Sequence, residues 1–215
     1  MIAEFLKTYL KLNDEKLLSE LESIFEIKTF SKGEKLICVG DEQQEIFLLV
    51  EGIIRGFLTD TEGREFTDCF EFQPGAPAVG CTSLDLPAQL NIQGLSSVTV
   101  LKISVKALEK LMEKYPEVVQ IYNRYLMRSL EEHFEHGIVK NTMTAGERYS
   151  WFVQKYSHLL EKVPHKYIAS FLNMTPQTLS KVRSKQKKMP VQYAKKMQGR
   201  KMVGGQSTNI PLKVN

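Results

Sequence analysis

The sequence predicts an α+β protein in which an N-terminal β jelly-roll barrel with flanking helices is followed by a long helix and an all-α helix-turn-helix domain. Three observations predict it. The spacing of apolar residues changes from three or four to two near residue 26, and back again near residue 104. Glycine turns separate the short apolar runs between these points. The last third is strongly basic: residues 141–215 hold fourteen Lys and Arg against two acidic residues, a net charge of +12.

The bulk composition fits a cytoplasmic protein. A length of 215 residues and a hydrophobic fraction of 42% allow one large or two small domains with true cores. We find no secretory leader and no apolar stretch long enough for a membrane helix. Cys38, Cys69 and Cys81 are too few and too widely spaced for a disulfide framework or a zinc site. Reduced thiols are the simplest interpretation, and a redox-sensing role for one of them is the alternative.

The first two thirds of the chain are predicted to form helices followed by a β barrel. Residues 2–23 have helical spacing, with Asn13 or Asp14 as the cap of a second piece. A jelly roll of about eight short strands is expected next. Its apolar runs are residues 27–30, 36–38, 46–50, 53–58, 66–72 and 98–103.

A long helix should link the two parts. A short helix over residues 105–114 precedes Pro116, which suits the first position of a longer helix. We expect that helix to reach residue 135 or 136, with Gly137 closing it. Val119, Tyr122, Leu126 and Leu130 recur at close to coiled-coil spacing and predict a homodimer seam. The alternative is that this stripe packs within its own subunit.

The basic third contains a helix-turn-helix pattern. A capping box of Thr144 and Glu147 begins its first helix. Pro164 begins another helix, and residues 172–174 form a turn in which Asn173 adopts a left-handed conformation. Thr175 then caps the next helix, with Pro176 at its first position. An ordinary helical hairpin is the alternative to a DNA-binding one.

The last of these helices has one apolar and one polar face. Leu179 and Val182 face inward, and the residues around them are polar and include no acid. In a major groove, Gln177 would pair with adenine and Lys181 with guanine, while most other contacts would go to phosphates. The expected DNA-binding residues are Lys166, Thr175, Gln177, Thr178, Ser180, Lys181, Arg183 and Lys185.

Together these motifs resemble the Crp/Fnr superfamily of bacterial transcription regulators. The likeness rests on Leu48-Leu-Val-Glu-Gly52 and Pro74-Gly75 in the barrel, and on Ile168-Ala-Ser-Phe-Leu and Thr175-Pro-Gln-Thr-Leu-Ser-Lys-Val-Arg183 in the basic third. It implies a cyclic-nucleotide-binding-like sensor domain at residues 1–115, a dimerisation helix and hinge at 116–140, and a DNA-binding domain with a basic tail at 141–215. It also implies a homodimer on palindromic promoter DNA, with RNA polymerase as a further partner.

The effector side departs from the cyclic-nucleotide pattern of that family. Gly80 is followed by Cys81 instead of Glu, and no Lys or Arg lies between Arg64 and Lys102. A buried phosphate without a cation is costly, so we expect no cAMP or cGMP binding. The alternative is that Arg124 or Arg128 of the long helix points inward and supplies the cation. A pocket for an unknown small molecule would involve Gly80, Cys81, Thr82 and Arg124.

We expect no cofactor and no metal. The first 37 residues lack cysteine, which excludes the family's usual iron–sulfur cluster. His133 and His136 lie three apart, but the carboxylates around them indicate a solvated helix end instead of a metal site. Residues 26–104 contain no histidine, which argues against a jelly-roll enzyme.

The tail leaves two questions open. Many relatives have a β-hairpin wing after the recognition helix, but residues 187–201 show no alternating strand pair, so a wing is doubtful. The competing function is a small-molecule-sensing module whose basic C-terminal region docks an acidic protein instead of DNA.

Overall fold

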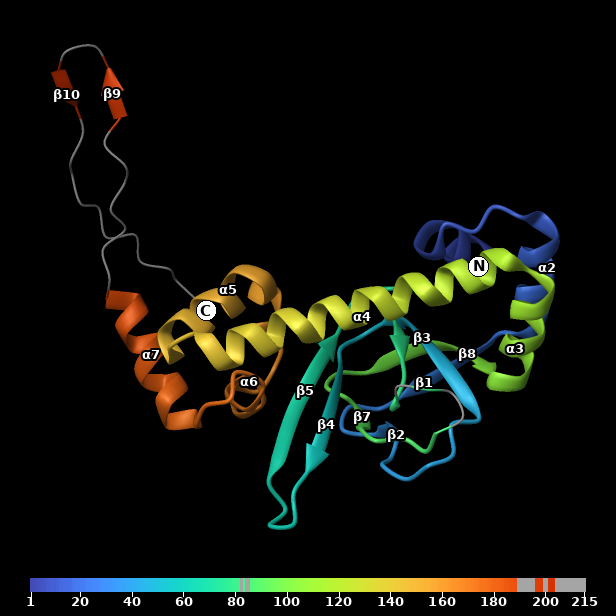
Figure 1. The fold of residues 1–215 in the computed structure, drawn as a ribbon, viewed down its shortest axis with the longest axis horizontal. Helices are drawn as coiled ribbons and strands as arrows, with labels where there is room; N and C mark the ends of the chain where they lie inside the picture. The colour runs from blue at the N-terminus through green and yellow to red at the C-terminus, as the bar shows by residue number, and fades with distance from the viewer. Residues whose placement is uncertain (82, 84–85, 189–195, 199–200, 204–215) are drawn as a thin grey trace.

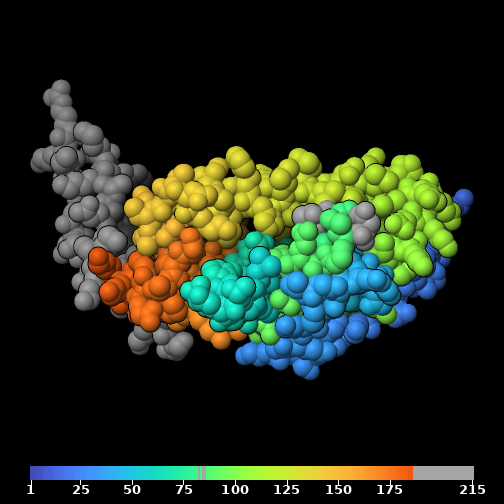
Figure 2. Space-filling view, turned by 60° about the horizontal axis from the view of Figure 1, so that its bottom comes forward, coloured from blue at the N-terminus to red at the C-terminus, as the bar shows by residue number. Residues whose placement is uncertain are grey.

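The structure, a computed structural model, describes residues 1–81, 83, 86–188, 196–198 and 201–203. It confirms the predicted fold class. Figure 1 shows a β barrel, the long helix α4 running past it, and a group of short helices at the far end of α4. In Figure 2, α4 lies along one side of the barrel and reaches the C-terminal helices.

Two short helical pieces cover one end of the barrel. They are α1 (Ile2–Phe5), which continues into a π-helical turn, η1 (Leu6–Leu10), and α2 (Glu15–Ile24). Of the two predicted caps, Asn13 and Asp14, it is Asp14 that caps α2, since its side chain accepts hydrogen bonds from the backbone N–H groups of Lys16 and Leu17. The apolar faces of these helices are buried against α3, α4 and the barrel.

The barrel has eight strands in two antiparallel four-stranded sheets, ordered β1-β8-β3-β6 and β2-β7-β4-β5. The strands are β1 (Glu26–Phe30), β2 (Lys35–Ile37), β3 (Glu45–Glu51), β4 (Ile54–Thr59), β5 (Glu65–Glu71), β6 (Pro77–Ala78), β7 (Asn91–Gly94) and β8 (Val98–Ser104). All six expected apolar runs overlap strands. Sequence reasoning missed β6 and β7, which are short and contain Pro, Asn and Gly, residues of low strand propensity.

Gly52 shows why the turns need glycine. It joins β3 to β4 at a φ of +112°, and a Cβ there would lie 2.5 Å from the Ser97 carbonyl oxygen. Any side chain at this position would push the β3–β4 connection away from the start of β8.

The long helix extends further than expected. α3 (Val105–Lys114) ends before Pro116, as predicted, but α4 (Pro116–Thr142) runs through Gly137. The expectation that Gly137 ends it is wrong. A mid-helix Gly costs about 1 kcal/mol, whereas the following turn buries Val139, which contributes about 1.5–3 kcal/mol. Tertiary burial therefore outweighs local propensity.

The C-terminal helices follow the predicted order. They are α5 (Ala145–Tyr156), the 3-10 turn η2 (Ser157–Leu159), α6 (His165–Phe171) and α7 (Pro176–Lys188). The Thr144–Glu147 capping box is present at the start of α5.

A strand pair lies beyond α7, contrary to expectation. β9 (Lys196–Gln198) and β10 (Lys201–Val203) pair antiparallel, with Met202 opposite Met197. Each strand has only three residues, which is too short for an alternating pattern to stand out in the sequence. The rest of the tail lies outside the described residues.

The barrel and the C-terminal helices share one apolar core. Ile53, Phe70 and Leu95 of the barrel cluster with residues of α5, α6 and α7, among them Phe152 and Phe171. The two parts are therefore fastened to each other by burial of apolar surface. Within the described part of the chain, no helix is both long and apolar enough to cross a membrane.

Candidate nucleic-acid interface and effector cavity

The turn between α6 and α7 has the predicted geometry. Asn173 has a φ of +50°, the left-handed region that asparagine tolerates. The Asn173 N–H donates to the Ser170 carbonyl at 3.0 Å, and the Met174 N–H donates to the Ala169 carbonyl at 3.0 Å. Met174 packs against the shared core. These contacts fix the direction in which α7 leaves the turn.

The start and the two faces of α7 also follow the sequence pattern. The Thr178 N–H donates to Thr175 Oγ1 at 3.1 Å, which caps the helix behind Pro176. Leu179 is buried and Val182 is half-buried. The exposed predicted DNA-binding residues are Lys166, Thr175, Gln177, Ser180, Lys181 and Lys185, and the half-buried ones are Thr178 and Arg183. The polar face of α7 is thus open to solvent and carries no carboxylate.

Two polar contacts hold α6 against the barrel. The Ser170 hydroxyl donates to the Glu65 carbonyl at 3.0 Å and accepts from the Thr67 N–H at 2.8 Å, both on β5. Arg55 of β4 is fully buried and ion-pairs with Glu65 at 2.7 Å. Its guanidinium lies 3.6 Å from the Tyr167 ring centroid of α6. The orientation of α7 is therefore tied to the β4–β5 hairpin.

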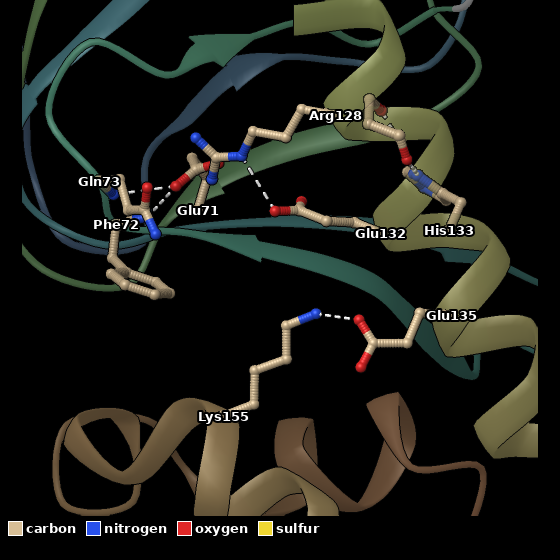
Figure 3. A network of polar contacts seen from close by, with 9 residues as sticks. Glu71, Phe72, Gln73, Arg128, Glu132, His133, Glu135 and Lys155 are labelled. Atoms are coloured by element: carbon tan, nitrogen blue, oxygen red, sulfur yellow. Dashed lines mark hydrogen bonds and ion pairs between the residues drawn. The ribbon is translucent and has the colours of Figure 1, made fainter.

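The C-terminal end of α4 fixes the other side of the helical group. His136, expected on a solvated helix end, is buried, and its Nε2–H donates to the Phe171 carbonyl at 2.9 Å. Burial lowers the pKa of His136 to about 4, so the ring is neutral at pH 7. Glu135 accepts from Trp151 Nε1 at 2.7 Å and ion-pairs with Lys155 (Figure 3).

The outer face of α4 carries an unpartnered apolar stripe. Leu126 is 44% exposed, Leu130 63% and Phe134 70%. Val119, Met127 and Ile138 continue the stripe and are also exposed. Of the four predicted seam residues, Val119, Leu126 and Leu130 lie on it, whereas Tyr122 is half-buried. Tyr122, Leu126 and Leu130 also line the internal cavity described below. The predicted seam left out Met127, Phe134 and Ile138, which are also exposed on this face.

A cavity of ≈ 550 Å³ lies between the barrel and α4. Most of its described lining is apolar, including Leu48, Val79 and Tyr125. Of the four predicted pocket residues, Gly80 and Cys81 line it, Thr82 lies outside the described residues, and Arg124 lies on the outer groove with Met127 and Phe134. Among the described residues, it is Arg128 that brings a guanidinium to the cavity wall.

Ion pairs within α4, and between α4 and β5, occupy the polar side of this cavity. Arg128 Nε donates to Glu132 Oε1 at 3.0 Å, and its Nη2 lies 3.4 Å from Glu71 Oε2 (Figure 3). His133 Nε2 lies 3.0 Å from Asp68 Oδ2, and this hydrogen bond raises the pKa of His133 to about 9. The described cations of the wall are thus already paired with carboxylates.

The residues that sequence reasoning missed are those that join the parts. For Arg55 the one signal was a charged residue inside an apolar run. Ser170 and His136 gave no signal, because only the tertiary structure brings β5 and Phe171 to them. In the described chain, no group of three or more His, Cys, Asp or Glu side chains is placed to hold a metal ion.

Comparison with known proteins agrees with this architecture. Residues 27–115 match the family model of the cyclic nucleotide-binding domain. FixK2 from Bradyrhizobium japonicum is similar in structure, with a TM-score of 0.67, 18% identity, and coverage of 75% of this chain and 84% of that one. The c-di-GMP-responsive global regulator CLP from Xanthomonas campestris gives 0.68 and 12%, covering 80% of this chain and 91% of its own. A CooA mutant from Carboxydothermus hydrogenoformans gives 0.68 and 20%, covering 87% and 85%.

A second, shorter likeness is to a different kind of protein. The translocase subunit SecY of Halalkalibacterium halodurans is 69% identical over 29 residues, which are 14% of this chain and 7% of that protein. The SecY of Mycobacterium tuberculosis is 67% identical over 30 residues, again 7% of its length. The chain therefore spans only 7% of the length of the curated relatives that it matches. A match this short does not assign the chain to their family.

The structural likenesses extend over three quarters or more of the chain and show its fold. Residues 27–115 are therefore similar to the cyclic nucleotide-binding domain, and the chain has the fold seen in FixK2, CLP and CooA, with a barrel, a long helix and C-terminal helices as predicted.

Proposed function

We propose that this protein is a DNA-binding transcription regulator that binds palindromic promoter DNA as a homodimer. The observation that carries the proposal is the exposed face of α7, which offers amide, hydroxyl and ammonium groups and no carboxylate. In a helix-turn-helix, such a face enters the major groove with its N-terminal half toward the base edges. Gln177 and Lys181 are the base-reading residues; the others on and beside α7 bind phosphates.

The apolar stripe of α4 supports the dimer. Monomeric proteins rarely expose a contiguous apolar patch of this kind, and a second copy of the same helix would cover it in a symmetric pair. Dimerisation would place the two α7 helices in successive major grooves, about 34 Å apart. A palindromic site with half-sites one helical turn apart matches that spacing.

Replacing Lys181 with Ala should weaken DNA binding and relax sequence preference. Loss of a bidentate base contact costs about 1–3 kcal/mol. Gel shifts against promoter fragments, over a series of salt concentrations, measure it. Lys110→Ala on α3 removes the same charge far from α7 and is the control. No binding to any fragment at low salt would argue against a DNA-binding role and for docking of an acidic protein.

We further propose that cAMP and cGMP are not the effectors, although the domain type binds cyclic nucleotides. Arg128, the guanidinium of the described wall, already contacts Glu71 and Glu132. A nucleotide phosphate would have to compete with two carboxylates for this cation, and leaving it unpaired in the cavity is costly. Another small molecule would be the signal.

Isothermal titration of the protein with millimolar cAMP or cGMP is therefore expected to give no binding heat. The Glu71→Gln variant is the matched test, because it removes one competing carboxylate and keeps the side-chain shape. A micromolar dissociation constant for cAMP with the unmodified chain would overturn this part of the proposal.

A further inference from the structure

One hydrogen bond joins the start of α6 to the middle of α7. Arg183 Nη1 donates to His165 Nδ1 at 2.9 Å. His165 is the first residue of α6 and is exposed, while Arg183 is half-buried. A guanidinium has only donors, so Nδ1 acts as the acceptor and the neutral imidazole carries its proton on Nε2.

The surroundings of His165 favour this neutral ring. Burial and the neighbouring Arg183 charge both lower the pKa of His165. The adjacent Lys166 is exposed, with its ammonium 4.8 Å from the Tyr167 ring centroid. Three donor side chains thus gather where α6 begins beside α7.

The bond also limits where Arg183 can reach. A free arginine side chain samples many rotamers and loses them when it binds an anion. Here the side chain is already held by α6, and the hydrogen bond uses one of several guanidinium N–H donors. The remaining donors stay available in a fixed orientation, which lowers the entropic cost of binding.

We propose that His165 is a positioning residue for DNA binding, which holds the Arg183 guanidinium in place for a backbone phosphate beside α7. The inference rests on the proposed DNA-binding function. A phosphate is the partner because Arg183 lies in the C-terminal half of α7, away from the half that faces base edges. The contact is therefore independent of DNA sequence.

A double-mutant cycle tests this with a fluorescein-labelled duplex of mixed sequence, measured by anisotropy over a salt series. Arg183→Ala should weaken binding and reduce the salt slope by about 0.9, the loss of one phosphate contact. His165→Ala should weaken binding about three- to tenfold. In the Arg183→Ala background, His165→Ala should have no further effect, because the residue acts through Arg183.

His165→Asn is the rescue variant. The asparagine side-chain oxygen takes the place of Nδ1 as the acceptor for Arg183, while the side chain has no counterpart of the Nε2–H donor. Because the contact to Arg183 is kept, the affinity for DNA should stay close to that of the unmodified chain. Thermal unfolding of each variant separates a binding effect from a folding one; because His165 is exposed, the midpoints should agree.

The outcomes separate the two proposals. If the unmodified chain binds no duplex at low salt, DNA binding and this inference both fail. If the unmodified chain binds the duplex and Lys181→Ala weakens that binding, DNA binding stands. If the losses of affinity in His165→Ala and Arg183→Ala then simply add in the double mutant, only the positioning role is overturned. If His165→Asn loses as much DNA affinity as His165→Ala, the contribution of His165 to binding comes from Nε2 and not from Nδ1. That result would also overturn the positioning role.

Discussion

Leu130→Glu in α4 is expected to convert the proposed dimer into a monomer and to remove most of its affinity for a palindromic site. Leu130 also borders the cavity, but it is 63% exposed in the middle of the apolar stripe and belongs to none of the buried clusters, so the change leaves the subunit's own core intact. In a dimer, two like charges would face each other in an apolar interface. Two linked recognition helices bind about 10²- to 10⁴-fold more tightly than one.

Light scattering after size exclusion gives the mass, and a gel shift on a palindromic fragment gives the affinity. Leu130→Met is the matched control, since it keeps an apolar side chain at the same point and should remain dimeric. A Leu130→Glu protein that keeps both the mass of the unmodified chain and its affinity would show that another surface joins the subunits.

Phe152→Ala is expected to cost about 3–5 kcal/mol of unfolding free energy, the usual range for a buried aromatic. Phe152 of α5 is fully buried and its ring lies 5.8 Å from Phe171 of α6 and 6.4 Å from Phe70 of β5. The vacated space would therefore lie where the barrel and the C-terminal helices meet. Loss of packing there should loosen both parts of the shared core.

Urea unfolding measures the cost, and hydrogen exchange locates it: amides of α5 and α6 should lose more protection than those of β1 and β8. Phe152→Leu fills most of the space and should cost about 1–2 kcal/mol. A cost below about 1 kcal/mol for the alanine variant would contradict the shared core.

Local chemistry made much of the fold predictable. The Thr144–Glu147 box, the left-handed Asn173 and the Thr175 cap each involve residues within a few positions of one another, so their geometry can be read from neighbours in sequence. The six apolar runs of the barrel were found for the same reason. Where a strand was very short, as in β6 and β9, no run existed to find.

The site was only partly predictable. The polar face of α7 follows from helical spacing, and its exposure matches the sequence. Arg124 and Arg128 were both candidates to point inward, and only Arg128 lines the cavity, because a helix residue's direction depends on which face packs on the barrel. His136 was expected in solvent, yet it donates to Phe171, a residue 35 positions away.

By itself, the sequence determined the order of elements, the helix-turn-helix and the absence of carboxylates from the surface of α7, because each depends on side chains close together along the chain. Only the tertiary structure decided that α4 continues through Gly137, that Arg55 and Ser170 fasten α6 to the β4–β5 hairpin, and that Arg128 pairs with carboxylates at the cavity. These depend on contacts between distant segments, whose burial outweighs the local preferences on which a sequence pattern rests.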